Sequence, residues 1–189
     1  MKRRIFICGP SSAGKTTLAK YIAKEFNVPY IFTDGAALRS KFGYNNHLDI
    51  IRASFSFPTE GFEYQSELFK ERKSLIVDNN EFVMDRSPID NIVYFLLQCS
   101  PVMPQDVCKA FIDDCKALLS EATHIIVLKS ASSVENDNVR IVNNYYQGLT
   151  DGVFYHVINN IVGITYYNSL LYPTWNWKDR INEVNKFLK

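Results

Sequence analysis

A glycine-rich stretch, Gly9 to Thr16, constrains the fold more than any other part of the chain. It reads Gly-Pro-Ser-Ser-Ala-Gly-Lys-Thr and matches the pattern G-x-x-x-x-G-K-[ST]. An apolar run over residues 5–8 precedes it, and a helical pattern follows, with apolar residues at every fourth position from Leu18. The order of strand, tight loop and helix is the context that a phosphate-binding loop requires.

The residue types of this stretch suit a bound triphosphate. Gly9 and Gly14 allow the backbone to curl so that successive N–H groups point at phosphate oxygens. Lys15 is expected to reach the β- and γ-phosphates, and the Thr16 hydroxyl to ligate Mg²⁺. We therefore predict a site for ATP and Mg²⁺. The other loop residues expected to contact the nucleotide are Ser12, Ala13 and Thr17. The alternative, a glycine-rich turn without a ligand, is opposed by the agreement of motif and context.

Length and composition predict one domain over residues 1–189. The 21 basic and 20 acidic residues give a net charge of +1, so no overall field attracts nucleic acid or anionic lipid. The four cysteines lack the spacing of a zinc site and are expected to be core residues in a reducing compartment. No apolar run approaches the roughly 20 residues of a membrane span. A cytoplasmic protein without a membrane partner is therefore expected, in the host cell if the chain is phage-encoded.

Two carboxylates follow apolar runs further along the chain. Asp34 comes shortly after the run 30–32, and Asp85 ends the run 81–85. The carboxyl ends of parallel strands face the crevice in which open α/β sheets bind ligands. Asp34 is therefore a candidate general base, with a purely structural turn beside Gly35 as the alternative. Asp85 is a candidate group for holding Mg²⁺, directly or through water.

Arg86 is a candidate phosphate contact because it directly follows Asp85, with a plain surface arginine as the alternative. The next residues predict a helix start. Ser87 suits the N-cap, Pro88 suits the first helical position, and Asp90 completes an S-x-x-D capping box. A firmly capped helix is therefore expected to hold Asp85 and Arg86 at the strand end.

The segments flanking this helix are less regular. Residues 43–61 lack periodicity and are predicted to be an irregular loop, within an acceptor-side region of about 34–76. The polar segment of about 130–145 is predicted to be a lid that brings Arg140 to the γ-phosphate, with a merely solvated loop as the alternative. Further predicted elements are a strand over 123–128, a helix over 142–160, a fifth strand over 164–167 and a final helix from Trp177.

Five strands alternating with helices predict an α/β fold, a three-layer sandwich around a parallel sheet. The phosphate loop, Asp34, the Asp85-Arg86-Ser87 triplet and Arg140 together resemble the P-loop nucleoside and nucleotide kinase superfamily over nearly the whole chain. The triplet is similar to the D/E-R-S motif of deoxynucleoside kinases. With the lid it most resembles small phage-type kinases grouped near ribosylnicotinamide kinases. This resemblance implies the strand order 2-3-1-4-5.

The resemblance also implies roles for matching residues. Lys15 and Thr16 would hold the phosphates and Mg²⁺, with Asp85 supporting the metal. Arg86 and Arg140 would contact transferred or acceptor phosphate.

Two further positions correspond to functional places in relatives. Asp34 lies where relatives that phosphorylate a hydroxyl keep their base. Residues 173–177 correspond to the place where relatives hold the adenine.

These features predict a kinase that transfers the γ-phosphate of ATP to a nucleoside- or nucleotide-type acceptor, with Asp34 as base for an acceptor hydroxyl. Arginines near residues 39–72 leave a nucleoside monophosphate open as acceptor. A hydroxymethylated pyrimidine in phage DNA is a further alternative. A non-catalytic, nucleotide-dependent switch is the alternative of another class. The preference for ATP over GTP and the formation of a homodimer stay open.

Overall fold

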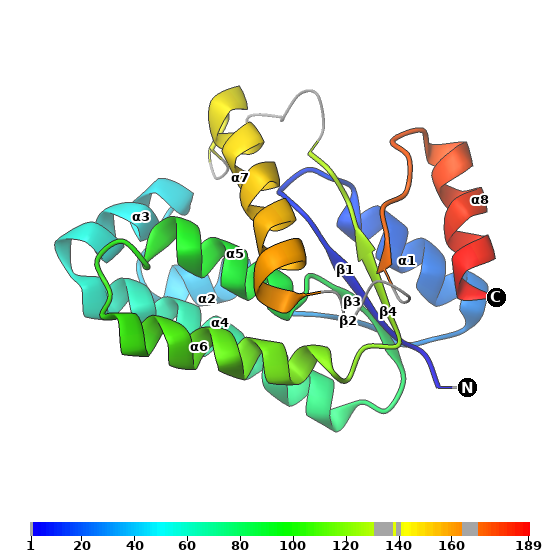
Figure 1. Ribbon diagram of the computed structural model, residues 1–189, viewed down its shortest axis with the longest axis horizontal. Coiled ribbons are helices and arrows are strands. Elements are labelled where there is room, and N and C mark those ends of the chain that lie inside the picture. Colours follow the sequence, from blue (N-terminus) through cyan, green and yellow to red (C-terminus); the bar gives the residue numbers. More distant parts are fainter. Residues whose placement is uncertain (1, 131–137, 139–140, 164–169) are drawn as a thin grey trace.

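The computed structural model describes residues 2–130, 138, 141–163 and 170–189. Within these residues, five strands form a parallel sheet in the order β2-β3-β1-β4-β5 (Figure 1). The strands are β1 (Arg4–Cys8), β2 (Tyr30–Phe32), β3 (Phe82–Asp85), β4 (His124–Val127) and β5 (Leu170–Leu171). The predicted α/β class and strand order are both confirmed.

Helices cover both faces of this sheet. α1 and α8 lie together on one face, α5 and α7 lie on the other, and α3 lies at the opposite end of the molecule from α8 (Figure 1). The helices are α1 (Lys15–Phe26), α2 (Gly35–Lys41), α3 (His47–Ser56), α4 (Pro58–Asp78), α5 (Pro88–Gln98), α6 (Gln105–Leu119), α7 (Asn144–His156) and α8 (Trp177–Leu188).

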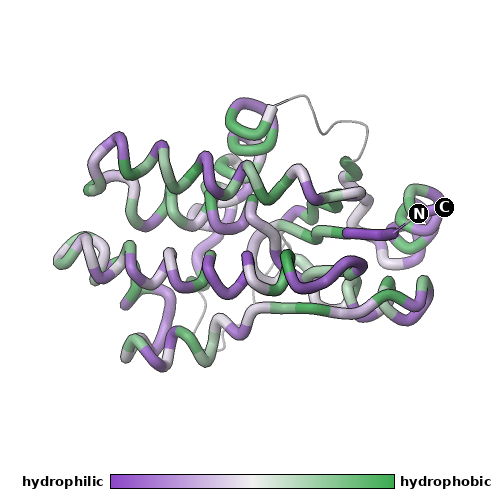
Figure 2. Tube along the Cα trace, turned by 90° about the horizontal axis from the view of Figure 1, so that it is seen from below, coloured by the Kyte–Doolittle hydropathy of each residue, from purple (hydrophilic) through white to green (hydrophobic). Residues whose placement is uncertain are grey.

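The central strand β1 is apolar on both faces because helices cover both. Ile5 and Ile7 pack in a cluster with apolar residues of α1 and α8. Phe6 and Cys8 belong to a second cluster, formed with residues of α4, α5, α6 and α7. Figure 2 shows hydrophobic and hydrophilic residues alternating along the helices, as expected for helices with one buried face. Alternation along one strand thus separates the two cores of the sandwich.

The prediction of an irregular loop over residues 43–61 is wrong. Residues His47–Ser56 form α3, and α4 begins at Pro58. Asn46, within the predicted loop, caps α3: its side chain accepts hydrogen bonds from the backbone N–H groups of Leu48 and Asp49. Asn46 is therefore a helix cap, and Pro58 is the first residue of a helix.

The C-terminal part of the chain differs in detail from the prediction. The helix expected over 142–160 is α7, which continues as a π-helix over Val157–Val162. The strand expected over 164–167 lies outside the described residues, and β5 follows at Leu170–Leu171. The final helix starts at Trp177 with Asn176 as N-cap, as predicted.

Candidate functional site

The phosphate loop lies between β1 and α1 and adopts a backbone that requires glycine at two positions. Gly9 has φ +140° and Gly14 has φ +86°, both in regions that residues with a side chain rarely adopt. A Cβ atom at Gly9 would also clash with the Leu128 carbonyl. Ser12, between them, has φ +64°. The curled backbone that the motif predicted is therefore present.

Lys15 is buried at the start of α1, with its side chain folded against the loop. Its Nζ donates hydrogen bonds to the carbonyl oxygens of Gly9, at 2.8 Å, and Pro10, at 2.5 Å. Burial, with the charge of Arg86 as a second cause, lowers the pKa of Lys15 from 10.5 to about 7. A phosphate bound on the loop would favour the charged form again.

Thr16 and Asp85 come together at the ends of α1 and β3. The Thr16 hydroxyl donates a hydrogen bond to the Asp85 carboxylate. The pair offers the hard oxygen ligands that Mg²⁺ prefers. In the part of the chain that the structure describes, no group of three or more His, Cys, Asp or Glu side chains can hold a metal. Two protein oxygens fit Mg²⁺, which is usually bound by one or two carboxylates, substrate phosphates and water.

Arg86 follows β3 in a strained conformation, with φ +78°. Its Nη1 lies 3.4 Å from the Asp90 Oδ1, and its guanidinium carbon lies 5.3 Å from the centre of the Tyr94 ring. Asp90 also accepts hydrogen bonds from the Ser87 backbone N–H and hydroxyl, which completes the predicted capping box. The cap of α5 thus orients the arginine beside the phosphate loop.

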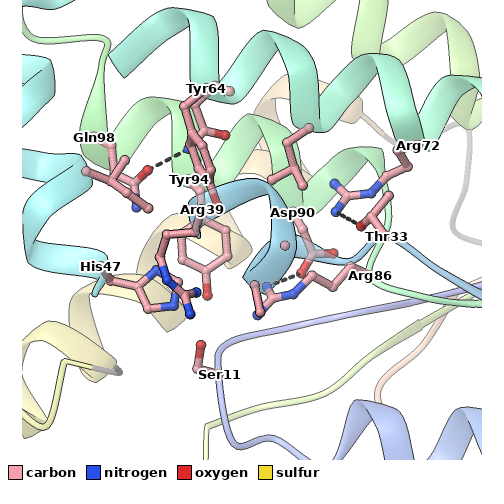
Figure 3. Close-up of a pocket in the computed structure, with 15 residues that line it drawn as sticks. Ser11, Thr33, Arg39, His47, Tyr64, Arg72, Arg86, Asp90, Tyr94 and Gln98 are labelled. Atoms are coloured by element: carbon pink, nitrogen blue, oxygen red, sulfur yellow. Dashed lines mark hydrogen bonds and ion pairs between the residues drawn. The ribbon is translucent and has the colours of Figure 1, made fainter. Parts of the chain in front are cut away.

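A cavity of about 370 Å³ extends from the phosphate loop into the space between α2, α3, α4 and α5. Figure 3 shows Arg39, His47 and Arg86 at the end near Ser11, and Tyr64 and Gln98 at the other. The residues that line this acceptor pocket are Ser11, Thr33, Gly35, Ala36, Arg39, His47, Ile50, Tyr64, Gln65, Leu68, Arg72, Arg86, Asp90, Tyr94 and Gln98. Its volume is in the range of small-molecule sites.

The inner end of the acceptor pocket carries two amide side chains. Gln65 Nε2 donates to Gln98 Oε1 over 2.5 Å, and both residues are buried. Gln65 Oε1 is buried and has no hydrogen-bond partner among the described residues. Tyr64, 4% exposed, and Ile50 provide apolar walls beside these amides. This end therefore combines flat apolar contact with unused hydrogen-bonding capacity.

Arg72 joins three parts of the pocket wall from its position in α4. Its guanidinium donates to Thr33 Oγ1 at 3.1 Å, to the Ser87 carbonyl at 3.1 Å and to the Asn91 side chain. Burial lowers the pKa of Arg72 to about 10. These bonds fix α4 against α5 and the end of β2, so Arg72 organises the pocket.

Asp34, the predicted base, is the N-cap of α2. Its Oδ1 accepts hydrogen bonds from the backbone N–H groups of Ala36 and Ala37. The residue is exposed and lies between Thr33 and Gly35, which both line the acceptor pocket. The structural role considered as an alternative is therefore present, and the catalytic role stays a prediction.

The remaining predicted site residues occupy different places. Ala13 is buried in the core beside α1, Ser12 lies in the curled loop, and Thr17 is exposed on the first turn of α1. Arg140 lies outside the described residues, as does most of the predicted lid.

Sequence reasoning missed most of the acceptor pocket. Asp90, Tyr94 and Gln98 stand four residues apart and line the pocket from one face of α5. A polar residue at every fourth position of an otherwise apolar helix was the signal available in the sequence. The sequence pattern predicts Asp90 only as part of a helix cap, and it gives no signal for His47.

Comparisons with known proteins identify the family. A family model described as an AAA domain matches residues 4–146. A tRNA dimethylallyltransferase from Phytoplasma australiense is 26% identical in an alignment of 162 residues that covers 77% of this chain. The match spans 53% of that relative, about half its length.

Several solved structures share the fold. Deoxyadenosine kinase from M. mycoides with bound dCTP has a TM-score of 0.66 and 15% identity, covering 100% of this chain and 98% of its own. YorR from Bacillus subtilis, in complex with phosphorylated GDP, has a TM-score of 0.56 and 14% identity, covering 97% and 92%. NadR in complex with NR has a TM-score of 0.59 and 14% identity, covering 98% and 51%.

Among the helices of the described residues, none is long and apolar enough to cross a bilayer. Family model, sheet order and phosphate loop agree with one another. The chain therefore belongs to the AAA-domain family, and its fold is that of the P-loop nucleotide kinases.

Proposed function

We propose that the protein is an ATP- and Mg²⁺-dependent kinase that phosphorylates a hydroxyl of a nucleoside- or nucleotide-type acceptor. One observation carries this proposal: the acceptor pocket opens at Ser11 of the phosphate loop and has Arg39 and Arg86 at that end. An acceptor in the pocket would face the terminal phosphate of a nucleotide on the loop. Transfer in line requires this placement.

The two ends of the acceptor pocket suit a nucleoside. The amides of Gln65 and Gln98 can hydrogen-bond a base edge, and Tyr64 and Ile50 can pack against its faces. The cationic end suits a phosphate that is transferred or already present. Two proteins of the same fold support a nucleoside as acceptor: one is a deoxyadenosine kinase, and the other is NadR in complex with NR.

Different residues of this chain have different roles in phosphoryl transfer. Lys15 and Arg86 stabilise charge on the transferred group, and Asp34 accepts the proton of the acceptor hydroxyl. When bound, Mg²⁺ at Thr16 and Asp85 neutralises phosphate charge. Both backbone bonds of Asp34 are made by Oδ1, so the cap fixes the carboxylate and does not use its second oxygen. Arg140 is the proposed lid residue.

A transfer assay with γ-labelled ATP tests the proposal. The acceptors are nucleosides, nucleoside monophosphates, ribosylnicotinamide, and DNA containing a hydroxymethylated pyrimidine. We expect label on one acceptor class with the wild type and none with Lys15→Ala. If only the DNA is labelled, the acceptor is the hydroxymethylated pyrimidine in DNA and not a small molecule. If ATP binds and no acceptor is labelled, the result would favour the non-catalytic switch.

Because the chain is similar to a tRNA dimethylallyltransferase, a second assay tests for dimethylallyl transfer. The protein is incubated with tRNA and dimethylallyl diphosphate, and the tRNA is analysed for the added group. We expect no transfer. Dimethylallyl transfer without phosphoryl transfer would contradict the kinase proposal.

A nucleoside monophosphate is the second candidate acceptor. The Arg39 guanidinium lines the acceptor pocket, and none of the ion pairs among the described residues involves it. An unpaired arginine at the cationic end suits an acceptor that carries its own phosphate. Such an acceptor is already ionised and needs no base.

Asp34→Asn distinguishes the two acceptors, because asparagine is as good an N-cap as aspartate and keeps α2 in place. For a hydroxyl acceptor we expect kcat to fall about 10²- to 10⁴-fold, the usual cost of losing a general base. The affinity for ATP and the melting temperature should stay near wild type. A kcat within about threefold of wild type would reject the hydroxyl acceptor in favour of the monophosphate.

A further inference from the structure

Arg180, in α8, connects the C-terminal part of the chain to the phosphate loop. Its Nε donates a hydrogen bond to the Thr174 carbonyl at 2.9 Å, and its Nη1 donates to the Ala13 carbonyl at 3.2 Å. The guanidinium carbon lies 5.0 Å from the centre of the Trp175 ring. The residue is only 4% exposed. One side chain therefore links α8, the loop before it and the loop that holds the triphosphate.

A buried arginine without an ion pair requires a reason, because burying a cation is costly. No carboxylate among the described residues lies within ion-pair distance of Arg180. α8 is already anchored by Val184 and Leu188, which are buried in the cluster shared with α1. Anchoring of α8 alone therefore does not explain the guanidinium.

The bond to Ala13 acts on a peptide of the phosphate loop. In a trans peptide, the carbonyl and the following N–H point in opposite directions. Holding the Ala13 carbonyl toward α8 therefore turns the Gly14 N–H away from α8. Gly14 has φ +86°, and its freedom as a glycine allows other orientations of this peptide. A substituent at Gly14 would also lie 3.3 Å from Arg180 Nη1, so the two residues are in close contact.

We propose that Arg180 is a positioning residue for the donor nucleotide: it fixes the Ala13–Gly14 peptide so that the Gly14 N–H can bind phosphate. The same guanidinium donates to the Thr174 carbonyl and lies over Trp175. It therefore fixes the position of the loop 172–176 relative to the phosphate loop. This inference rests on the proposed nucleotide site, and it adds a residue distant in the sequence to that site.

Inorganic tripolyphosphate is the probe, because it has no base or ribose and reports only on the phosphate loop. Its dissociation constant with Mg²⁺ is measured by calorimetry beside that of MgATP. Arg180→Met keeps the length of the side chain and removes every hydrogen-bond donor. Without the bond to the Ala13 carbonyl, the Gly14 N–H is no longer held toward the phosphate, so we expect both affinities to fall by about tenfold, the usual effect of losing one hydrogen bond. Arg180→Lys, which keeps the charge and one donor, should recover part of the loss.

Lys178→Met is the matched control, since it removes an exposed cation from the same helix. We expect it to bind tripolyphosphate as the wild type does. Unchanged tripolyphosphate binding in Arg180→Met, with weaker ATP binding only, would overturn the inference and make Arg180 a nucleoside contact. If Arg180→Met does not fold, unchanged binding by Arg180→Lys overturns it. Failure of the wild type to bind tripolyphosphate would instead contradict the nucleotide site itself.

Discussion

Single residues of the phosphate loop are held in states that a bound anion would change. Lys15 is buried, bonded to two carbonyl oxygens of the loop, and has a pKa of about 7. Above pH 7 the amine is therefore mostly neutral in the free protein. The unfolded chain keeps it charged up to about pH 10.5, so this group lowers stability below pH 7 and the penalty is relieved as pH rises from 7 to 10.5.

Nucleotide binding at pH 8 should therefore be coupled to proton uptake, because the triphosphate favours the Lys15 ammonium. Calorimetry in buffers with different ionisation enthalpies measures the protons exchanged. We expect close to one proton taken up per MgATP at pH 8 and much less at pH 6. Lys15→Arg should abolish the uptake, since a guanidinium stays charged. Equal uptake at both pH values would contradict the lowered pKa.

Helices and strands were predicted where local signals act without help from the rest of the chain. The cap formed by Ser87, Pro88 and Asp90 places α5, and Asn176 places α8. The failure over residues 43–61 has a physical cause. Asn46 and Pro58 favour turns and helix starts alike, and the packing of Ile50 and Tyr64 in a separate small core decides for helices.

The acceptor pocket could be predicted only in part, because packing between helices decides which of their residues line it. Arg86, which lines this pocket, follows β3, while Asp85 ends β3 and Asp34 lies shortly after β2. The binding of ligands at the carboxyl ends of parallel strands predicts where these three residues lie. His47, Gln65 and Gln98 come from three helices, and only their packing brings them to one cavity. Sequence spacing within one helix gives no information on which other helix it faces.

The contact between α3 and α4 depends on a glycine. A Cβ at Gly61 would lie 2.6 Å from the Ser54 Cα, so the two helices approach too closely for any side chain. Gly61→Ala should destabilise the protein by about 1–3 kcal/mol, the usual cost of overpacking. Gly148→Ala, in the exposed face of α7 with nothing within 4 Å, should stabilise it by about 0.5–1 kcal/mol.

Chemical denaturation of both variants measures these free energies of unfolding. The same substitution should thus have opposite signs in two helices. Equal effects at both positions would show that helix propensity, rather than the contact of α3 with α4, decides the result.

At the scale of the whole molecule, the sheet brings donor and acceptor sites together at one edge. The phosphate loop follows β1, Asp85 ends β3 with Arg86 directly after it, and Thr33 follows β2. These three strands are neighbours in the order β2-β3-β1. Arg86 lies where the two sites meet, since it lines the acceptor pocket and its charge adds to the effect of burial in lowering the pKa of Lys15.

The steady-state kinetics of Arg86→Gln test this arrangement most directly, by giving kcat and the KM of each substrate in γ-phosphate transfer. An arginine aimed at the transferred group acts mainly in the transition state, so kcat should fall about 10²- to 10³-fold while each KM changes only severalfold. Arg52→Gln, an exposed arginine on α3, is the control and should behave as the wild type. A change confined to one KM, with kcat unchanged, would contradict transfer between the two sites at Arg86.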